Sequence, residues 1–372
     1  MIYRMVSCYI KIFYIYSILL LQLSLSLNFF NIQFDFSDNI EQLIPSNVAN
    51  DRSKLFFWYL GCSSSSKLYS LKCAEHKSSN QILEAYKKIQ DYLYNYEGRL
   101  ESNIFRPTID NIVFNKSIDH LTALNQFKQC AILTGHNSAE FATQLRPYQI
   151  LGSDPAQELT IAQQFNAIKF YEALEKVFKW FPVFGRTNRQ IVSRVLYEYL
   201  TPNDLQYFRP VDYVKKINDL VTDWQFACQS YQLASNYART GNRVYKYEFN
   251  YTLSTTLLDP VLLEAGFTGG ATHGDELFAM FGYLLKPELS LTTTQAERDF
   301  TQKIVFYWTN FVMYDGPSAV TYDSVTTWEP FIESTNYFQT DYTNCGRELV
   351  MSKDSIKMKT GYSSHHCKFW EF

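Results

Sequence analysis

The most informative segment of this 372-residue chain is residues 266–282, GFTGGATHGDELFAMFG. It places His273 in a glycine-rich loop, directly before a helical turn that opens with Asp275 and Glu276. Glycines let the backbone approach its neighbours closely, and acidic residues suit the positive end of a helix. A histidine held in this way is well placed to transfer a proton. Residue types alone leave a purely structural histidine as the commoner alternative.

Segments upstream of this loop predict two buried strands, and helical patterns lie on both sides of it. Residues 129–135, QCAILTG, form a short apolar run that ends in glycine, which is typical of a buried parallel strand. Residues 243–249, RVYKYEF, alternate and are rich in aromatic residues, which predicts a second strand. Helical patterns dominate residues 51–100, 154–200, 215–239 and 298–312. Helices that alternate with a few buried strands indicate an α/β fold.

Composition narrows the class of protein. Apolar residues make up 46% and charged residues 19% of the chain, which excludes a disordered or collagen-like protein. The formal net charge is −3 and the 34 lysines and arginines are dispersed, so we expect no nucleic-acid partner. None of the seven cysteines lies in a CxxC pair, which argues against a zinc site. We therefore expect no cofactor and no metal.

The N-terminus has the pattern of an export signal. Residues 1–11 carry basic residues and no acid, an apolar run begins at residue 12, and small residues follow near residue 26. Residues 1–26 therefore predict a secretory signal peptide, with a signal anchor or a non-native segment as alternatives. Cleavage would leave six cysteines, which fits disulfides in a secreted, extracellular protein. The sequons at Asn115 and Asn250 agree with export and predict glycosylation.

The segment ATHGDELFAMFG, residues 271–282, resembles the catalytic-histidine motif of the type B carboxylesterase and cholinesterase family. Other segments resemble further parts of that family in the same order. They are LGCSSSSKLYSLKCAEH at 60–76, IFRPTIDNIVF at 104–114, AILTGHNSAEF at 131–141, RTGNRVYKYEF at 239–249 and HHCKFWEF at 365–372. The resemblance implies that residues 55–372 are the C-terminal part of an α/β-hydrolase domain, with the N-terminal half of its sheet missing. Residues 27–54 stay unassigned.

The same resemblance implies roles for individual residues. His273 corresponds to the general base, and Glu140 corresponds to the acid that orients it. The implied reaction is ester hydrolysis by serine, histidine and glutamate through an acyl-enzyme. Phe141 stands where the family usually has glycine after the acid. The family's two disulfides correspond to the pairs Cys62–Cys73 and Cys228–Cys367.

The nucleophile of that mechanism is absent from the sequence. There is no G-x-S-x-G elbow, and there is no HGG or GGG oxyanion loop. We expect the chain to retain the acid and the histidine but not to hydrolyse esters as it stands, because loss of the nucleophile costs about a million-fold in rate. A small ester would be its substrate only if the missing half of the domain were supplied.

Two other interpretations stay open at this point. The chain could be a non-catalytic, cholinesterase-like secreted or adhesion protein with a protein partner. It could also be an exported remnant with a role of its own. Under each interpretation, residues 1–50 could be translated non-coding sequence, because they do not resemble the part of the family that would lie there.

Overall fold

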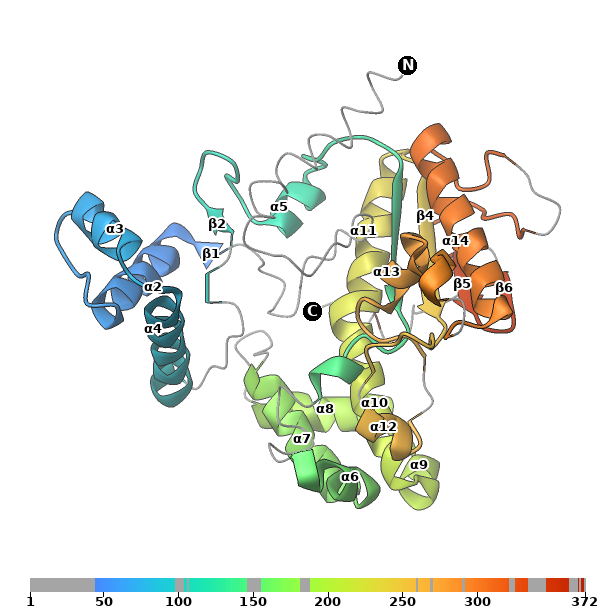
Figure 1. Ribbon diagram of the computed structural model, residues 1–372, viewed down its shortest axis with the longest axis horizontal. Helices are drawn as coiled ribbons and strands as arrows, with labels where there is room; N and C mark the ends of the chain where they lie inside the picture. The colour runs from blue at the N-terminus through green and yellow to red at the C-terminus, as the bar shows by residue number, and fades with distance from the viewer. Residues whose placement is uncertain are drawn as a thin grey trace. The chain divides into compact units, whose positions relative to one another are not determined.

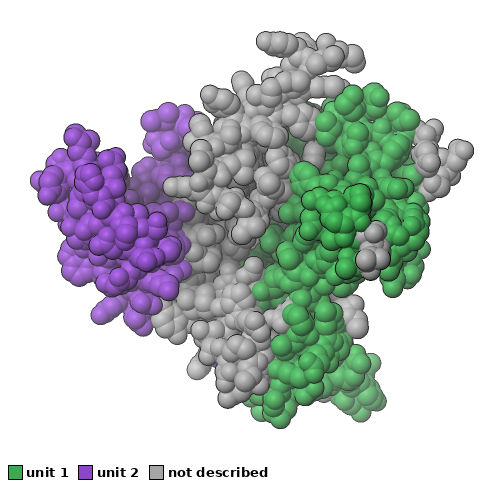
Figure 2. Space-filling model, viewed as in Figure 1, with its two compact units in different colours: residues 1–34, 127–170, 198–372 green, residues 35–126, 171–197 purple. Residues whose placement is uncertain are grey.

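The computed structural model describes residues 44–97, 104–105, 107–145, 155–180, 188–258, 260–267, 270–289, 292–320, 325–333, 346–360, 367 and 369–370. The predicted signal segment, residues 1–26, lies outside these ranges. The described parts of residues 127–170 and 198–372 form one compact unit, and those of residues 35–126 and 171–197 form a second (Figure 2). No described helix is both long and apolar enough to cross a membrane.

A four-stranded sheet forms the core of the first unit. In order of pairing, its strands are β3 (Ile132–Asn137), β4 (Val244–Asn250), β5 (Glu348–Ser352) and β6 (Ile356–Lys359). The first three strands run parallel, and β6 runs antiparallel to β5. Helices occupy the connections between the parallel strands, as parallel pairing requires. The predicted α/β class is confirmed, with a mixed sheet.

β3 differs from its prediction at both ends. It begins at Ile132 rather than Gln129, and it continues through Gly135 to Asn137. Gly135 therefore lies inside the strand instead of ending it. A Cβ atom at Gly135 would lie 2.3 Å from the carbonyl oxygen of Tyr247 in β4, so a larger residue would force the backbone to shift. Close approach of two strands, rather than a turn, explains this glycine.

One face of the sheet packs against α13 (Asp275–Met280) and α14 (Gln295–Tyr314), which lie on the same side of it in Figure 1. This face is apolar and aromatic. Its buried residues from the strands and α14 are Leu133, Tyr245, Tyr247, Phe249, Leu349, Met351, Phe300, Ile304, Tyr307, Trp308 and Phe311. α14 begins with a capping box between Thr294 and Glu297, close to the predicted start of that helix.

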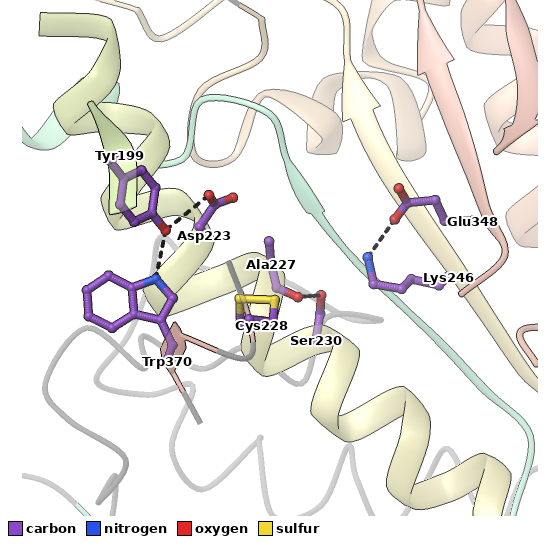
Figure 3. Close-up of a disulfide and its surroundings, with 9 residues drawn as sticks. Tyr199, Asp223, Ala227, Cys228, Ser230, Lys246, Glu348 and Trp370 are labelled. Carbon is purple, nitrogen blue, oxygen red and sulfur yellow. Dashed lines mark hydrogen bonds and ion pairs between the residues drawn. A yellow bond between two sulfur atoms is a disulfide. The ribbon is translucent and has the colours of Figure 1, made fainter. Parts of the chain in front are cut away.

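The opposite face of the sheet is also buried, but it carries charged residues. α11 (Cys228–Arg239) packs against β3 and β4 here. The buried polar residues of this face are Thr134, His136, Lys246, Glu248 and Glu348. The Nζ atom of Lys246 lies 2.6 Å from Oε2 of Glu348, and both side chains are 1% exposed (Figure 3). Because side chains alternate along β4, its aromatic residues lie on one buried face of the sheet and its charged residues lie on the other.

A nearly continuous helical run precedes α11. It consists of α10 (Pro210–Thr222) and a π-helical turn over Asp223–Ala227. The predicted helical region is confirmed, but it begins earlier than residue 215 because Pro210 occupies the first turn, where its missing N–H is not needed. α6 (Pro155–Gln163) contacts both α10 and α12 (Pro260–Glu264), and α9 (Pro202–Tyr207) directly precedes α10. α7 (Ala167–Trp180) and α8 (Asn188–Tyr199) each contain residues of both units.

The disulfide Cys228–Cys367 ties the C-terminal segment to the start of α11, with a Sγ–Sγ distance of 2.01 Å (Figure 3). Nearby, the Trp370 ring stacks on Trp224 with centroids 5.2 Å apart. The Trp370 indole N–H donates to the Tyr199 hydroxyl over 2.8 Å. This predicted pair is therefore at bonding distance, and aromatic packing holds the segment beside it.

The second unit contains α2 (Ser46–Tyr59), α3 (Lys67–Glu75), α4 (Ser79–Tyr92) and α5 (Ile118–Ala123). A π-helical turn, Leu93–Glu97, extends α4, and β1 (Ile44–Pro45) pairs in parallel with β2 (Thr108–Ile109). The predicted pair Cys62–Cys73 is at bonding distance, with a Sγ–Sγ distance of 2.01 Å. α4 begins with a capping box between Ser78 and Gln81.

Candidate active site

The carboxyl end of β3 leads directly into the loop that carries Glu140. The Glu140 side chain is 3% exposed. One of its oxygens, Oε1, accepts a hydrogen bond from the backbone N–H of Asn137 over 2.7 Å. Ala139 forms an isolated parallel bridge with Thr272, and its N–H donates to the Ala271 carbonyl over 2.8 Å. The acid loop and the histidine loop are therefore joined through their backbones.

His273 and Glu140, which are 133 positions apart in the chain, meet at the end of the sheet. The Nδ1 atom of His273 lies 2.8 Å from Oε2 of Glu140. The histidine side chain is 23% exposed, whereas the acid is buried. The ring of Phe226, from the π-helical turn before α11, lies 5.5 Å from the His273 ring. Single π-helical turns inside α-helices are frequent at functional sites.

Phe141 does not prevent this pairing. Its backbone has φ −85° and ψ −6°, and because this φ is negative, glycine is not required at this position. The side chain is 2% exposed and packs inward. The departure from the family pattern therefore leaves Glu140 in contact with His273.

Asp275 organises the turn around His273. Its carboxylate accepts hydrogen bonds from the N–H of Thr272 over 3.0 Å and from the N–H of Leu257 over 2.8 Å. The Thr256 hydroxyl donates to it over 2.6 Å. Burial raises the pKa of Asp275, and these three donors oppose that rise because they favour the ionised form. Asp275 thus fixes the loop rather than facing solvent.

Glu276 is a second buried carboxyl near the pair. It is 2% exposed, and burial followed by the charge of Glu140 raises its pKa to about 7. The Nδ2 group of Asn137 donates to Oε2 of Glu276 and, over 2.8 Å, to the Thr272 carbonyl. The sequence singled out Glu276 only as an acid at a helix start. Asn137 lies in the segment AILTGHNSAEF, residues 131–141, and had no role assigned from the sequence.

The predicted glycosylation residues lie in different surroundings. Asn115 is exposed in a bend before α5. Asn250 ends β4 and is half-buried, and its Oδ1 accepts from the Ser138 hydroxyl over 2.9 Å. Glycosylation of both residues stays a prediction, and the exposure of Asn115 favours that site.

The histidine loop also approaches Ser138 closely. Gly270 has φ +95°, and a Cβ there would lie 2.0 Å from the Ser138 hydroxyl oxygen. This contact explains the glycine directly before Ala271 and Thr272. Among the described residues, no group of three or more histidine, cysteine, aspartate or glutamate side chains is arranged to hold a metal ion.

Comparison with known proteins identifies the family. The family model described as "Carboxylesterase family" matches residues 38–370, and so begins upstream of Leu55. The chain is 23% identical to "Cholinesterase" of Mus musculus over 322 residues, covering 87% of this chain and 47% of that protein. It is 22% identical to "Liver carboxylesterase 1" of Oryctolagus cuniculus over 301 residues, covering 79% of this chain and 48% of that protein. The chain spans about half the length of these relatives. Because the family model covers most of its length, the chain belongs to the carboxylesterase family.

Proposed function

We propose that this chain supplies the histidine and the acid of a serine ester hydrolase. The contact between His273 and Glu140 carries the proposal, because a buried acid holds one ring nitrogen of a partly exposed histidine at 2.8 Å. Donation from Nδ1–H to the carboxylate selects the tautomer in which Nε2 is the basic nitrogen. In that role His273 takes the proton of an attacking serine and later returns it to the leaving alcohol, while Glu140 stabilises the imidazolium.

The nucleophile in this proposal comes from outside the 372-residue sequence, which holds no G-x-S-x-G. The hydrogen-bond pattern of β3 supports a sheet that lacks a strand beside β3. The N–H groups of Ile132 and Ser138 donate towards β4, so alternation directs those of Leu133 and Gly135 to the other edge. Within the described residues no strand pairs along that edge, although β3 is buried throughout. A buried parallel strand normally has two neighbours.

The first test is chemical. We expect the secreted 372-residue chain alone to hydrolyse neither short-chain aryl esters nor acetylthiocholine, and not to react with a fluorophosphonate probe. Labelling that disappears when one serine is replaced would show that this chain contains its own nucleophile, and would contradict the proposal.

The second test supplies the missing part. If sequencing of the transcript upstream finds an in-frame G-x-S-x-G, the longer chain should react with the probe and hydrolyse esters. His273→Gln and Glu140→Gln should then each reduce kcat, the first more strongly, because the base acts directly and the acid acts through it. Unchanged kcat in both variants would remove these residues from the mechanism.

A non-catalytic cholinesterase-like protein, secreted or displayed for adhesion, is the second candidate. The absence of the elbow from the sequence favours it. A transcript that adds no serine elbow, together with a monodisperse secreted chain that unfolds cooperatively, would support this candidate over the hydrolase. Under either function we propose export, because two disulfides suit an oxidising compartment.

A further inference from the structure

Asn137, the last residue of β3, bonds to both loops of the candidate site. Its backbone N–H donates to Oε1 of Glu140 over 2.7 Å. Its side-chain Nδ2 donates to the carbonyl of Thr272, the residue directly before His273, over 2.8 Å. The same nitrogen donates to Oε2 of Glu276. Asn137 is 1% exposed, so water does not compete for these bonds.

The chemistry of an amide suits this position. Glu140 and Glu276 are both buried, and the charge of Glu140 disfavours ionisation of Glu276. A cationic donor between them would draw Glu140 away from His273, because opposite charges attract strongly in a buried site. An amide is neutral and donates through fixed geometry. The amide therefore gives Glu276 a hydrogen-bond donor and does not compete with His273 for the charge of Glu140.

We propose that Asn137 is a positioning residue, which fastens the backbone before His273 to the loop of Glu140 and so sets the distance between imidazole and carboxylate. This inference rests on the proposed function, since Asn137 acts only through that pair. Substitution of its side chain leaves its backbone N–H bond to Glu140 in place. The variant therefore removes the side-chain hydrogen bond to the histidine loop and keeps the backbone hydrogen bond to Glu140.

Ser138 provides a matched control, because it joins the same two loops without touching either carboxyl. Its hydroxyl accepts from the N–H of Ala271 over 3.1 Å and donates to Oδ1 of Asn250 over 2.9 Å. If loss of any one link between the loops were sufficient to separate His273 from Glu140, Ser138→Ala and Asn137→Ala would act alike. If Asn137 has a specific role, only its variant should disturb the histidine.

The measurement is nuclear magnetic resonance of the full chain with ¹⁵N-labelled histidine. An imidazole Nδ1–H bonded to a buried carboxylate gives a downfield, slowly exchanging proton and the ¹⁵N shifts of the Nε2-basic tautomer. Replacement of His273 identifies its signal among the six histidines. We expect the parent chain and Ser138→Ala to keep this proton and Asn137→Ala to lose it. Retention of the proton in Asn137→Ala would overturn the role of Asn137.

A second variant tests whether misfolding, rather than loss of the side-chain donor, removes the proton in Asn137→Ala. Asn137→Leu has the same branching of side-chain heavy atoms as asparagine, keeps the backbone N–H and has no side-chain donor, so it should also lose the proton while the other histidine signals stay dispersed. A Leu variant that keeps the proton would overturn the proposal. Absence of the proton from the parent chain would instead contradict the His273–Glu140 pair, and with it the proposed function.

Discussion

The two faces of the sheet in the first unit are equally buried but are built from opposite chemistry. The face towards α13 and α14 consists of aromatic and aliphatic side chains. The face towards α11 holds Lys246, Glu248 and Glu348, and these are charged residues that rarely lie inside proteins unless they are paired. The apolar face gains stability with every atom it buries. The charged face contributes to stability only while each buried charge keeps a partner of opposite charge, because a lone buried charge is costly.

Adjacent residues of β5 allow this contrast to be measured, and the largest effect is expected on the charged face. Glu348→Ala leaves the Lys246 ammonium group buried without the carboxylate 2.6 Å away. We expect a loss of about 3–5 kcal/mol in the free energy of unfolding. Urea unfolding of the secreted chain measures it. A loss below about 1 kcal/mol, the range of exposed pairs, would mean that water reaches Lys246.

The matched change on the apolar face is Leu349→Ala. Leu349 is 0% exposed and is the next residue along the same strand, with its side chain in the aromatic cluster. Its replacement creates a cavity, and we expect a loss of about 2–5 kcal/mol, somewhat below that of Glu348→Ala. The same urea titration gives both values. A larger loss for Leu349→Ala would reverse the ranking of the two faces.

The charged face should also make stability depend on pH. Burial, and then the charge of Glu348, raises the pKa of Glu248 from its ordinary value of 4.5 to about 7. The folded chain therefore holds an extra proton between these values. This contribution to stability is complete below pH 4.5 and is lost as the pH rises through 7, by up to about 3 kcal/mol.

His136, which lies opposite Glu248 in the sheet, has the opposite effect. Burial, and then the charges of Lys246 and Lys359, lowers its pKa well below 6.5, so stability falls as the pH drops below that value. Glu248→Gln should flatten only the decline towards neutral pH, as followed by Tm between pH 4 and 8. Glu276→Gln is the control, because Glu276 shares a raised pKa near 7 but belongs to the site. An unchanged profile in Glu248→Gln would contradict the role of Glu248 in this decline.

The smallest effect is expected when both partners of the buried pair are removed. The double variant Lys246→Met and Glu348→Leu replaces two charges with apolar side chains of similar length. Buried pairs exchanged in this way are often neutral in stability or slightly better. We expect a change within about 1 kcal/mol of the parent, far from the sum of the single variants. A loss as large as that of Glu348→Ala would show that the pair contributes net stability.

Local pattern was sufficient for much of the fold, whereas the choice of site residues depended on the resemblance to the carboxylesterase family. The alternation of residues 243–249 predicted β4, and the helical pattern of residues 298–312 predicted most of α14. The roles of His273 and Glu140 came from ordered motifs, and the structure brings the two together. The strand at residues 129–135 was misplaced because its glycine was interpreted as a terminator. The close contact between Gly135 and Tyr247 depends on strand pairing, which no local window contains.

The sequence by itself determined which chemical groups this protein carries: a histidine in a glycine-rich loop, an acid after a buried strand, cysteines at the family's spacing and no serine elbow. The tertiary structure decided how these groups are held, and which residues without a predicted role contact them. Asn137 acquires its role because the end of β3 lies beside a loop 135 positions later in the chain. The charged residues of β4 are buried because α11 covers them. Burial and long-range contacts arise only when the chain is packed. They set the hydrogen bonds and the pKa of a residue, and its neighbours in the sequence do not reveal them.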